Sequence, residues 1–489
     1  MRKATTSTVA PLTLPCAHES VYVGIDVGKQ RHIAGLVSAG LLARHERFEG
    51  CPVLAFDNSR EGFRSLIDRI QTLCPLEQAY VMLEKTGHYH LALVDYLLEQ
   101  DLSVYLVHVH ERPRGLTKTD KRDALNLANH LYNQLEKGVQ FADRSELARR
   151  ALPPSEPAAQ LKGRMGHRYE LIHECTRRKN KLTALCDQLF PELPQVFRDP
   201  NSPTALRVRE RYPTAAAVAT ADLEELWAVK GRTHPGRKQL ASLQTLAAQS
   251  IGVHDPIRLQ GLVFEQEQLI HELQLLERHL EEIACKEEHI LQASREGRIL
   301  RSIPGIGVHA AAAILAAIGN IDNFPNAAAL KAYFGWAPAI RQSGVSVNST
   351  TLSRAGERTM KAMMYLVAMK AIQDPGPWAD LYERLVERGC SYDERRREYS
   401  GKKRILGRIA GQMIALLYGL LRSDVELRAR TPAHEPLPEP LLYDATLHHA
   451  HQTGAYHSMK GPARPARIVR LARRAEPHQE LCREPTTQQ

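Results

Sequence analysis

The sequence predicts an α/β domain in the first third of the chain, followed by a long helical pair and an all-α C-terminal domain. Short apolar runs alternate with helical patterns over residues 20–150, which is typical of an α/β fold with a mixed sheet. Two later segments, 158–190 and 260–298, repeat apolar residues at alternating spacings of four and three, which is typical of paired helices. Residues 299–425 keep a helical pattern throughout.

The first domain contains apolar runs that are bounded by breakers and are too short for helices. They cover residues 21–25, 80–83 and 102–107, and we expect each run to form a buried strand. Asp26 ends the first run and Glu84 ends the second. A single acid at a strand end is commonly a solvated turn residue or a helix cap, so neither residue indicates a site by itself.

Two further acids, Asp120 and Asp123, lie three residues apart in the run 118–124. This run opens a predicted helix, so both side chains share one helical face. Acids in a first helical turn also interact favourably with the helix dipole, which is the simpler interpretation of this pair. Together with the strand-end acids they can converge on one point, where four carboxylates repel each other unless cations lie between them. Such an oxygen-rich site suits Mg²⁺, and paired Mg²⁺ ions are a common device for phosphodiester transfer.

A proline-rich break at 153–157 separates this domain from the predicted helical pair. The first seam, which Arg168 and Lys179 interrupt, has seven apolar positions: Leu161, Met165, Ile172, Cys175, Leu182, Cys186 and Leu189. The second seam, which Gln266 and Glu287 interrupt, also has seven: Leu262, Leu269, Leu273, Leu276, Leu280, Ile283 and Ile290. We expect an antiparallel coiled coil within 158–298 that mediates dimerisation or domain spacing; the alternative is two amphipathic helices, each packed on a globular core. Residues 200–255 are expected to form an insertion at its tip, to which we assign no function.

The C-terminal domain opens with residues 303–307, which resemble the turn of a helix-hairpin-helix motif. Gly305 and Gly307 would let the backbone approach a phosphate, and the following helix would offer free N–H groups. A tight turn between packed helices needs no DNA, so the sequence leaves both interpretations open.

Basic residues concentrate late in the chain. A dense stripe consists of Arg395, Arg396 and Arg397, then Lys402, Lys403 and Arg404, and finally Arg408. It indicates either a nucleic-acid contact or a solvated helix face. Residues 430–489 are rich in Pro, Arg and His with little periodicity, so we expect a disordered basic tail, and residues 1–19 are expected to form a flexible leader.

Bulk composition narrows the class of protein. The 489 residues include 65 Lys and Arg against 55 Asp and Glu, and this net charge of +10 is consistent with a polyanionic partner. No apolar run approaches the roughly 20 residues needed to span a bilayer, and the start lacks the apolar core of a secretory signal.

The cysteines and histidines do not form a recognisable zinc motif. The eight cysteines include no Cys-x-x-Cys pair, which argues against a zinc ribbon. Two His-x-His pairs, at 88–90 and 108–110, lack a third ligand at zinc-like spacing.

Motifs in two blocks carry a family resemblance. The first block has Gly-Ile-Asp-Val-Gly-Lys at 24–29, Glu-Lys-Thr-Gly-His-Tyr at 84–89 and Lys-Thr-Asp-Lys-Arg-Asp-Ala at 118–124. The second has Ser-Ile-Pro-Gly-Ile-Gly at 302–307 and Ala-Tyr-Phe-Gly-Trp-Ala-Pro at 332–338. In this order they resemble the DEDD-type transposases of bacterial insertion sequences, the bridge-RNA-guided serine recombinases of insertion-sequence family 110.

The resemblance implies a fold, a metal site and partners. The first domain would be RNase H-like, similar to Holliday-junction resolvases. Mg²⁺, or alternatively Mn²⁺, would be bound by the four acids: Asp26, Glu84, Asp120 and Asp123. The partners would be element-end and target DNA and a guide RNA, and the chain would act in the bacterial cytoplasm as a homo-oligomer, either a dimer or a tetramer.

The resemblance also implies that a C-terminal serine attacks DNA and forms a transient phosphoserine link. Ser343, in Gln-Ser-Gly at 342–344, lies at the matching position. The family has more glycine after this serine, which leaves Ser346 as the alternative nucleophile and Ser349 as a weaker one. Arg341 and Arg354 would stabilise the charge on the phosphate.

The leading prediction is therefore a transposase, a site-specific recombinase that cleaves and exchanges DNA strands with Mg²⁺. A kinase of the actin and sugar-kinase type also begins with Gly-Ile-Asp-x-Gly, but the sequence has neither the second Asp-x-Gly phosphate loop nor the glycine-rich adenosine site. A non-catalytic nucleic-acid-binding protein is the third candidate, and the presence of all four acids argues against it.

Overall fold

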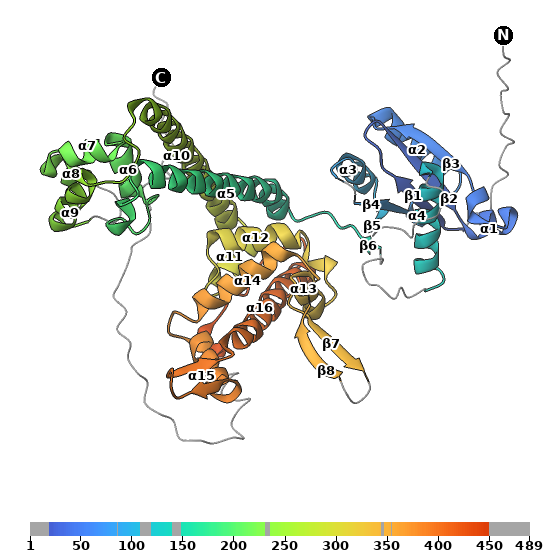
Figure 1. Cartoon of the computed structure of the whole chain (residues 1–489). Helices are drawn as coiled ribbons and strands as arrows, with labels where there is room; N and C mark the ends of the chain where they lie inside the picture. The colour runs from blue at the N-terminus through green and yellow to red at the C-terminus, as the bar shows by residue number, and fades with distance from the viewer. Residues whose placement is uncertain are drawn as a thin grey trace, which may run out of the picture. The chain divides into compact units, whose positions relative to one another are not determined.

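The computed structural model describes residues 19–85, 87–107, 119–138, 148–229, 235–343, 347–353 and 355–448, without the side chains of 340–343 and 347–350. The chain divides into two compact units (Figure 1). The first consists of Met1–Ser155 with Asn320–Pro325, and the second of Glu156–Gly319 with Asn326–Gln489.

The first unit is built on a six-stranded mixed sheet of order β3-β2-β1-β4-β5-β6. Strands β3, β2 and β1 pair antiparallel, β4 and β5 continue parallel to β1, and β6 is an antiparallel edge. The strands are β1 (Val21–Asp26), β2 (Arg31–Val37), β3 (Val53–Asp57), β4 (Ala79–Glu84), β5 (Ser103–Val107) and β6 (Arg149–Arg150). The helices are α1 (Ala39–His45), α2 (Arg60–Gln71), α3 (Leu91–Glu99) and α4 (Asp120–Leu135). The predicted α/β region with a mixed sheet is confirmed.

Side-chain alternation divides the core of this unit between the two faces of the sheet. Val23 and Ile25 of β1 belong to a buried cluster with α2 and α3, whereas Tyr22 and Met82 belong to a second cluster with α4 (Figure 1). Because successive strand residues point to opposite faces, each central strand serves both clusters. The central strands therefore read as nearly continuous apolar runs in the sequence.

A buried histidine, His32 of β2, lies beside Phe56 and Phe63 in the cluster with α2. Its Nδ1 accepts a hydrogen bond from the Gly28 amide at 3.2 Å. Burial lowers the pKa of this imidazole below its usual value. The native state therefore holds the neutral ring, whereas the unfolded chain takes up a proton once the pH falls below about 6.5.

We expect the first unit to lose stability as the pH falls from about 7.5 to 5.5, by at most about 1.4 kcal/mol per pH unit from this group. The variant His32→Gln should lose this part of the pH dependence, whereas the exposed-site control His88→Gln should keep it. The urea midpoint for labelling of the buried thiols of Cys51 and Cys74 measures the effect. Equal pH slopes in the wild type and in His32→Gln would contradict the assignment.

The second unit is mostly helical. Its helices are α5 (Glu156–Leu189), α6 (Pro203–Arg211), α7 (Ala215–Thr220), α8 (Leu223–Ala228), α9 (Arg237–Ala248), α10 (Pro256–Ala293), α11 (Arg295–Ser302), α12 (Val308–Ile318), α13 (Ala327–Tyr333), α14 (Arg358–Ala371), α15 (Pro377–Gly389) and α16 (Lys402–Arg430). Two antiparallel hairpins interrupt them, formed by β7 (Pro338–Ser343) with β8 (Val347–Leu352) and by β9 (Ser391–Asp393) with β10 (Glu398–Ser400). The prediction of an all-α C-terminal domain was therefore wrong at these two places, because neither hairpin carries the alternating apolar pattern of a core strand.

Helices α5 and α10 form the long predicted pair, and they run antiparallel. Three ion pairs join them, with residue numbers that mostly rise in one helix as they fall in the other: Lys181–Glu265, Lys179–Glu277 and Arg178–Glu272. The shared seam is apolar around Leu182 and Leu273. These interhelical contacts favour the antiparallel pair over two independent helices.

Helix α16 is the one helix in the described ranges that is long and apolar enough to cross a membrane. Half of the residues in the most apolar part of this helix are buried inside the protein. The helix contacts α13, α14 and α15. The core helix of a folded unit meets the same criteria of length and composition.

The chain after α16 is attached to α11 as far as it is described. Glu439 forms an ion pair with Arg298 at 2.7 Å, and the Tyr443 amide donates a hydrogen bond to the Ser302 hydroxyl at 2.9 Å. Residues 431–448 of the predicted disordered tail therefore have defined contacts in this structure. Residues 449–489 lie outside the described ranges.

Candidate active site

Asp26 and Glu84 end neighbouring parallel strands at the same edge of the sheet. Strands β1 and β4 pair with Ile25 beside Leu83, and the next residue in each strand is the acid. Neighbouring strands lie about 5 Å apart, so the two acids occupy adjoining positions. Both are partly exposed.

Strand alternation places both acids on the face of the sheet that α4 covers. Along β1, Ile25 belongs to the cluster on the opposite face, whereas Tyr22 belongs to the α4 cluster. Asp26 is four residues after Tyr22 and therefore shares its face. Along β4, Glu84 is two residues after Met82 of the α4 cluster and lies on the same face for the same reason.

Helix α4 runs along β1 with its N-terminal end toward Asp26. At the start of β1, the Tyr22 hydroxyl donates a hydrogen bond to the Glu136 carboxylate, which lies just beyond the last turn of α4. Two residues further along β1, Gly24 lies against Ala124, so close that a Cβ on Gly24 would be 2.2 Å from the Ala124 carbonyl oxygen. The first turn of α4 therefore lies toward the strand end that carries Asp26.

That first turn carries the other two acids. The Thr119 hydroxyl caps the helix by accepting a hydrogen bond from the Arg122 amide at 3.3 Å. Asp120 is exposed, and Asp123 is only 6 % exposed. The backbone positions of all four predicted acids thus belong to one face and one edge of the sheet.

A closed set of metal ligands is not formed in the part of the chain that the structure describes. Within those ranges, no three His, Cys, Asp or Glu side chains are arranged as a metal site, and this holds for His88 and His90 as well. Residues 108–118, which precede Asp120 and include the second histidine pair, lie outside the described ranges. The donors at this edge are all carboxylates, a set that suits a hard divalent cation such as Mg²⁺ rather than Zn²⁺.

Ser343 lies in the second unit, at the end of strand β7. In the β7–β8 hairpin its backbone pairs with Val347, so it stands at the loop end of the hairpin. The hairpin extends away from the helices of this unit (Figure 1). The alternative nucleophile Ser346 belongs to residues 344–346, which lie outside the described ranges, as does Arg354. Arg341 is two residues before Ser343 on the same strand.

Comparison with known families covers both regions. Residues 23–191 match the DEDD family of IS110, described as "Transposase", and residues 297–383 match the family described as "Transposase IS116/IS110/IS902 family". The chain belongs to the IS110/IS116 family of transposases. The first match contains all four acids, and the second contains Ser343.

Relatives of nearly full length agree with this assignment. The transposase is 25 % identical to the insertion element IS110 uncharacterized 43.6 kDa protein of Streptomyces coelicolor, over 84 % of this chain and 96 % of that protein. It is 24 % identical to the IS116 44.8 kDa protein of Streptomyces clavuligerus, over 76 % and 89 % of the two chains. It is 23 % identical to the pilin gene-inverting protein of Moraxella bovis, over 82 % and 96 %. The chain is therefore an enzyme of the DNA transposase and recombinase class.

The glycine-rich turn of the transposase has a structural explanation at one of its two glycines. Gly305 has a φ of +84°, and a Cβ there would lie 2.6 Å from the Val367 carbonyl oxygen of α14. Glycine is therefore required for the turn to pack on α14. Gly307, which precedes α12, is exposed and has open space around it, so it remains a candidate for contact with a phosphate.

The predicted basic residues at the start of α16 also differ in role. Lys402 and Lys403 are exposed. The guanidinium of Arg404 donates a hydrogen bond to the Gly389 carbonyl oxygen and so ties α16 to the end of α15. Arg404 therefore has a structural contact, and the two lysines remain as candidates for nucleic acid.

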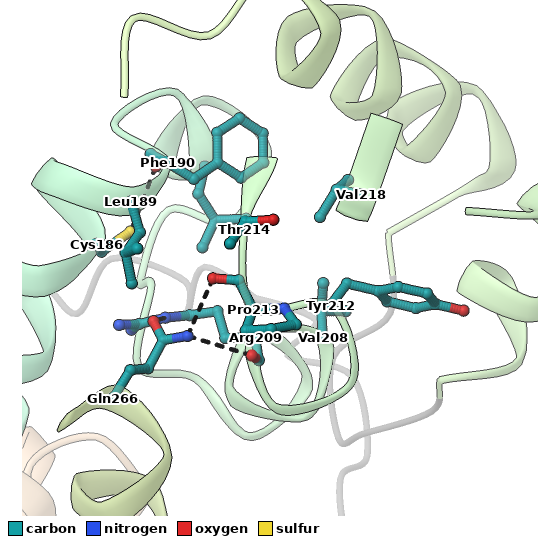
Figure 2. A pocket seen from close by; sticks show the side chains of 11 residues that line it. Cys186, Leu189, Phe190, Val208, Arg209, Tyr212, Pro213, Thr214, Val218 and Gln266 are labelled. Atoms are coloured by element: carbon teal, nitrogen blue, oxygen red, sulfur yellow. Dashed lines mark hydrogen bonds between the residues drawn. The ribbon is translucent and has the colours of Figure 1, made fainter. Parts of the chain in front are cut away.

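A small pocket lies among α5, α6, α7 and α10, in the region predicted as an insertion (Figure 2). Arg209 lines the pocket and is only 4 % exposed. Burial lowers the pKa of its guanidinium group below the usual value. The Arg209 Nε donates to the Gln266 side chain at 2.9 Å, and Nη2 donates to the Leu182 carbonyl oxygen at 2.7 Å. These bonds join three helices, so we interpret the pocket as a packing feature rather than a ligand site. They also explain why Gln266 interrupts the apolar seam.

Gly24 sets the distance between β1 and α4, although it is not among the residues predicted to form the site. A side chain at this position would collide with the backbone of the helix that carries Asp120 and Asp123. A glycine inside an apolar strand is the signal for such a close approach of another backbone.

Proposed function

We propose that this transposase cleaves and rejoins DNA strands through a phosphoserine intermediate on Ser343, assisted by Mg²⁺ bound to Asp26, Glu84, Asp120 and Asp123. The observation that carries the proposal is the placement of two strand ends and the first turn of α4 at one face and edge of the sheet. Three antiparallel strands followed by two parallel strands, with acids at the strand ends, support an RNase H-like fold for this unit.

The four acids would act as ligands, and the bound Mg²⁺ would neutralise negative charge on the scissile phosphate. The Ser343 hydroxyl would attack phosphorus, forming the Oγ–P bond as the bond to the leaving sugar oxygen breaks. The serine proton passes to a base and the leaving oxygen takes up a proton, so the phosphodiester is exchanged rather than hydrolysed. Arg341, on the same strand, would stabilise the phosphate charge.

The acids and Ser343 belong to different compact units of the chain. A serine hydroxyl is a poor nucleophile unless a base or a metal assists it. We therefore propose a composite centre in which Ser343 stays unreactive until an acidic unit, from the same chain or from another copy in a homo-oligomer, docks on it.

The proposed substrates are the two ends of the mobile element and its target DNA, with a guide RNA that selects them. The family assignment and the relative named pilin gene-inverting protein support DNA recombination. The guide RNA rests on the motif resemblance and is compatible with the net charge of +10.

Trapping of the covalent intermediate tests the nucleophile. On a nicked suicide DNA substrate the wild type should form an adduct at Ser343, and Ser343→Ala should reduce its yield roughly a thousandfold, since the attacking atom is removed. Thr351→Ala, on the opposite strand of the same hairpin, is the matched control and should keep the adduct, and Ser349→Ala, which removes the weaker alternative, should keep it too. Mass spectrometry of the attached peptide identifies the residue. Loss of the adduct in Ser346→Ala with retention in Ser343→Ala would reassign the nucleophile, and no adduct in the wild type would end the serine mechanism.

A further inference from the structure

The short β9–β10 hairpin precedes α16 and falls outside both matched stretches, 23–191 and 297–383. Its strands pair Ser391 with Ser400 and Asp393 with Glu398. All residues from 391 to 398 are exposed, and none belongs to the buried core. A two-stranded hairpin is only marginally stable by itself in water. Because residues 391–398 contribute nothing to the buried core, core packing does not explain why this element is present.

Backbone contacts order the loop of the hairpin. One oxygen of the Asp393 carboxylate accepts hydrogen bonds from the amides of Arg395 at 3.0 Å and Arg396 at 3.2 Å. Arg397 has a φ of 53°, in the left-handed region, and closes the turn. The loop therefore forms without the three arginine side chains, which are all exposed.

These arginines have no internal use in the part of the chain that the structure describes. Within it, none of Arg395, Arg396 and Arg397 forms an ion pair, and the same is true of Lys402 and Lys403. The segment from β9 to Lys403, residues 391–403, contains five cations and three acids, so its net charge is +2. An exposed cluster of unpaired cations attracts a polyanion, and arginine guanidinium groups bind phosphates in a bidentate manner.

Two tyrosines lie beside this cluster. Tyr392 and Tyr399 are directly opposite each other in the hairpin, and their ring centroids are 5.0 Å apart. Tyr392 is 52 % exposed. Tyrosine side chains are among the groups that contact the phosphates and sugars of a duplex, a use that a merely solvated charged hairpin does not have.

The hairpin arises near the base of the other hairpin, which carries Ser343. The ring of Trp336, two residues before β7, packs on Gly407 of α16, where an added Cβ would lie 3.1 Å from the ring. Gly407 is six residues after Gly401, the residue that links β10 to α16. Six residues of helix correspond to about 9 Å, so both hairpins start from the same end of α16.

We propose that the β9–β10 hairpin, together with Lys402 and Lys403, is a nucleic-acid-binding arm that holds the phosphate backbone of a duplex beside the hairpin that carries Ser343. This proposal rests on the proposed recombinase function and specifies where that function engages its substrate. The duplex is either element DNA or a guide-RNA hybrid, since both present the same phosphate chemistry.

The test is equilibrium binding of the full chain in a Ser343→Ala background, so that no strand chemistry intervenes. The probes are a fluorescein-labelled DNA duplex of about 30 base pairs carrying an element end and an RNA–DNA hybrid of the same sequence. Anisotropy is measured over a range of salt concentrations. The variant Arg395→Gln/Arg396→Gln/Arg397→Gln should lower the slope of log K against log salt by about 2 to 3, because each lost phosphate contact removes about 0.9. Its affinity near about 0.15 M salt should fall at least about tenfold on the duplex that the arm holds.

The matched control removes three exposed lysines and arginines elsewhere in the same unit, Lys162→Gln/Lys238→Gln/Arg258→Gln, and should keep the wild-type slope. The conservative triple replacement of Arg395, Arg396 and Arg397 with lysine should retain most of the slope, which a purely structural role of the loop would not predict. A larger loss on DNA than on the hybrid assigns the arm to element DNA, and the reverse assigns it to the guide. An unchanged slope on both probes in a glutamine variant with wild-type melting temperature would overturn the proposal. The Ser343 adduct assay is separate, so its failure is distinguishable from failure of the arm.

Discussion

Asp26→Asn should reduce DNA strand transfer roughly a thousandfold or more while the first unit stays folded. Asparagine keeps the shape of the side chain but removes the charge that a divalent cation requires. Removing one charge from a group of neighbouring carboxylates also relieves repulsion, so stability should not fall. Glu84→Gln and Asp123→Asn should lower strand transfer to a similar extent, since these residues share the face and edge of the sheet with Asp26.

The matched control is Asp95→Asn, an exposed acid on α3, which packs on the opposite face of the sheet. It should leave strand transfer within about twofold of the wild type, as is usual for surface sites. A second readout is independent of activity: Mg²⁺ at a hundred times its dissociation constant should stabilise the wild-type first unit by about 2.7 kcal/mol. This gain should disappear in Asp26→Asn. An undiminished gain would remove Asp26 from the ligand set.

The convergence of the strand-end acids could be predicted from the sequence because it depends on local properties. Strand ends are marked by the change from apolar to charged residues, and parallel neighbours end at the same edge of a sheet. The direction of α4 could not be predicted in this way. It is fixed by two long-range contacts of β1: Tyr22 bonds to Glu136 just beyond the last turn of α4, and Gly24 allows the backbone of the helix to approach closely nearer its first turn.

The two hairpins of the second unit could not be predicted from the sequence either, but for a different reason. A strand is recognised in sequence by apolar alternation, which arises only when one face is buried. The β9–β10 hairpin is exposed over residues 391–398, so no such signal exists there. The helical seam shows a smaller error of the same kind. The predicted seam includes Ile172, which is 37 % exposed, whereas its neighbour Leu171 is buried. The difference arises because a period of 3.6 residues drifts from an ideal heptad.

Gly24→Ala is expected to destabilise the first unit by about 3 kcal/mol and to abolish strand transfer. An added Cβ would lie 2.2 Å from both the Ala124 carbonyl oxygen and the Ala128 amide nitrogen. The matched control is Gly166→Ala on α5, where nothing lies within 4 Å of the added Cβ. That variant should stabilise its helix by up to about 1 kcal/mol. Thermal unfolding and strand transfer are measured for both variants.

The loss of activity in Gly24→Ala should exceed the loss of folded protein. The atoms in conflict belong to the backbone of α4, so no rotamer change relieves the contact and the whole helix must move away from the sheet. Its first turn, with Asp120 and Asp123, then moves relative to Asp26 and Glu84, and a displacement of about 1 Å at a reacting centre can cost about a hundredfold in rate. Cooling the variant until circular dichroism shows a fully folded chain should therefore not restore strand transfer. Full recovery of activity on refolding would show that Gly24 serves stability alone and that the separation of β1 and α4 does not position the acids.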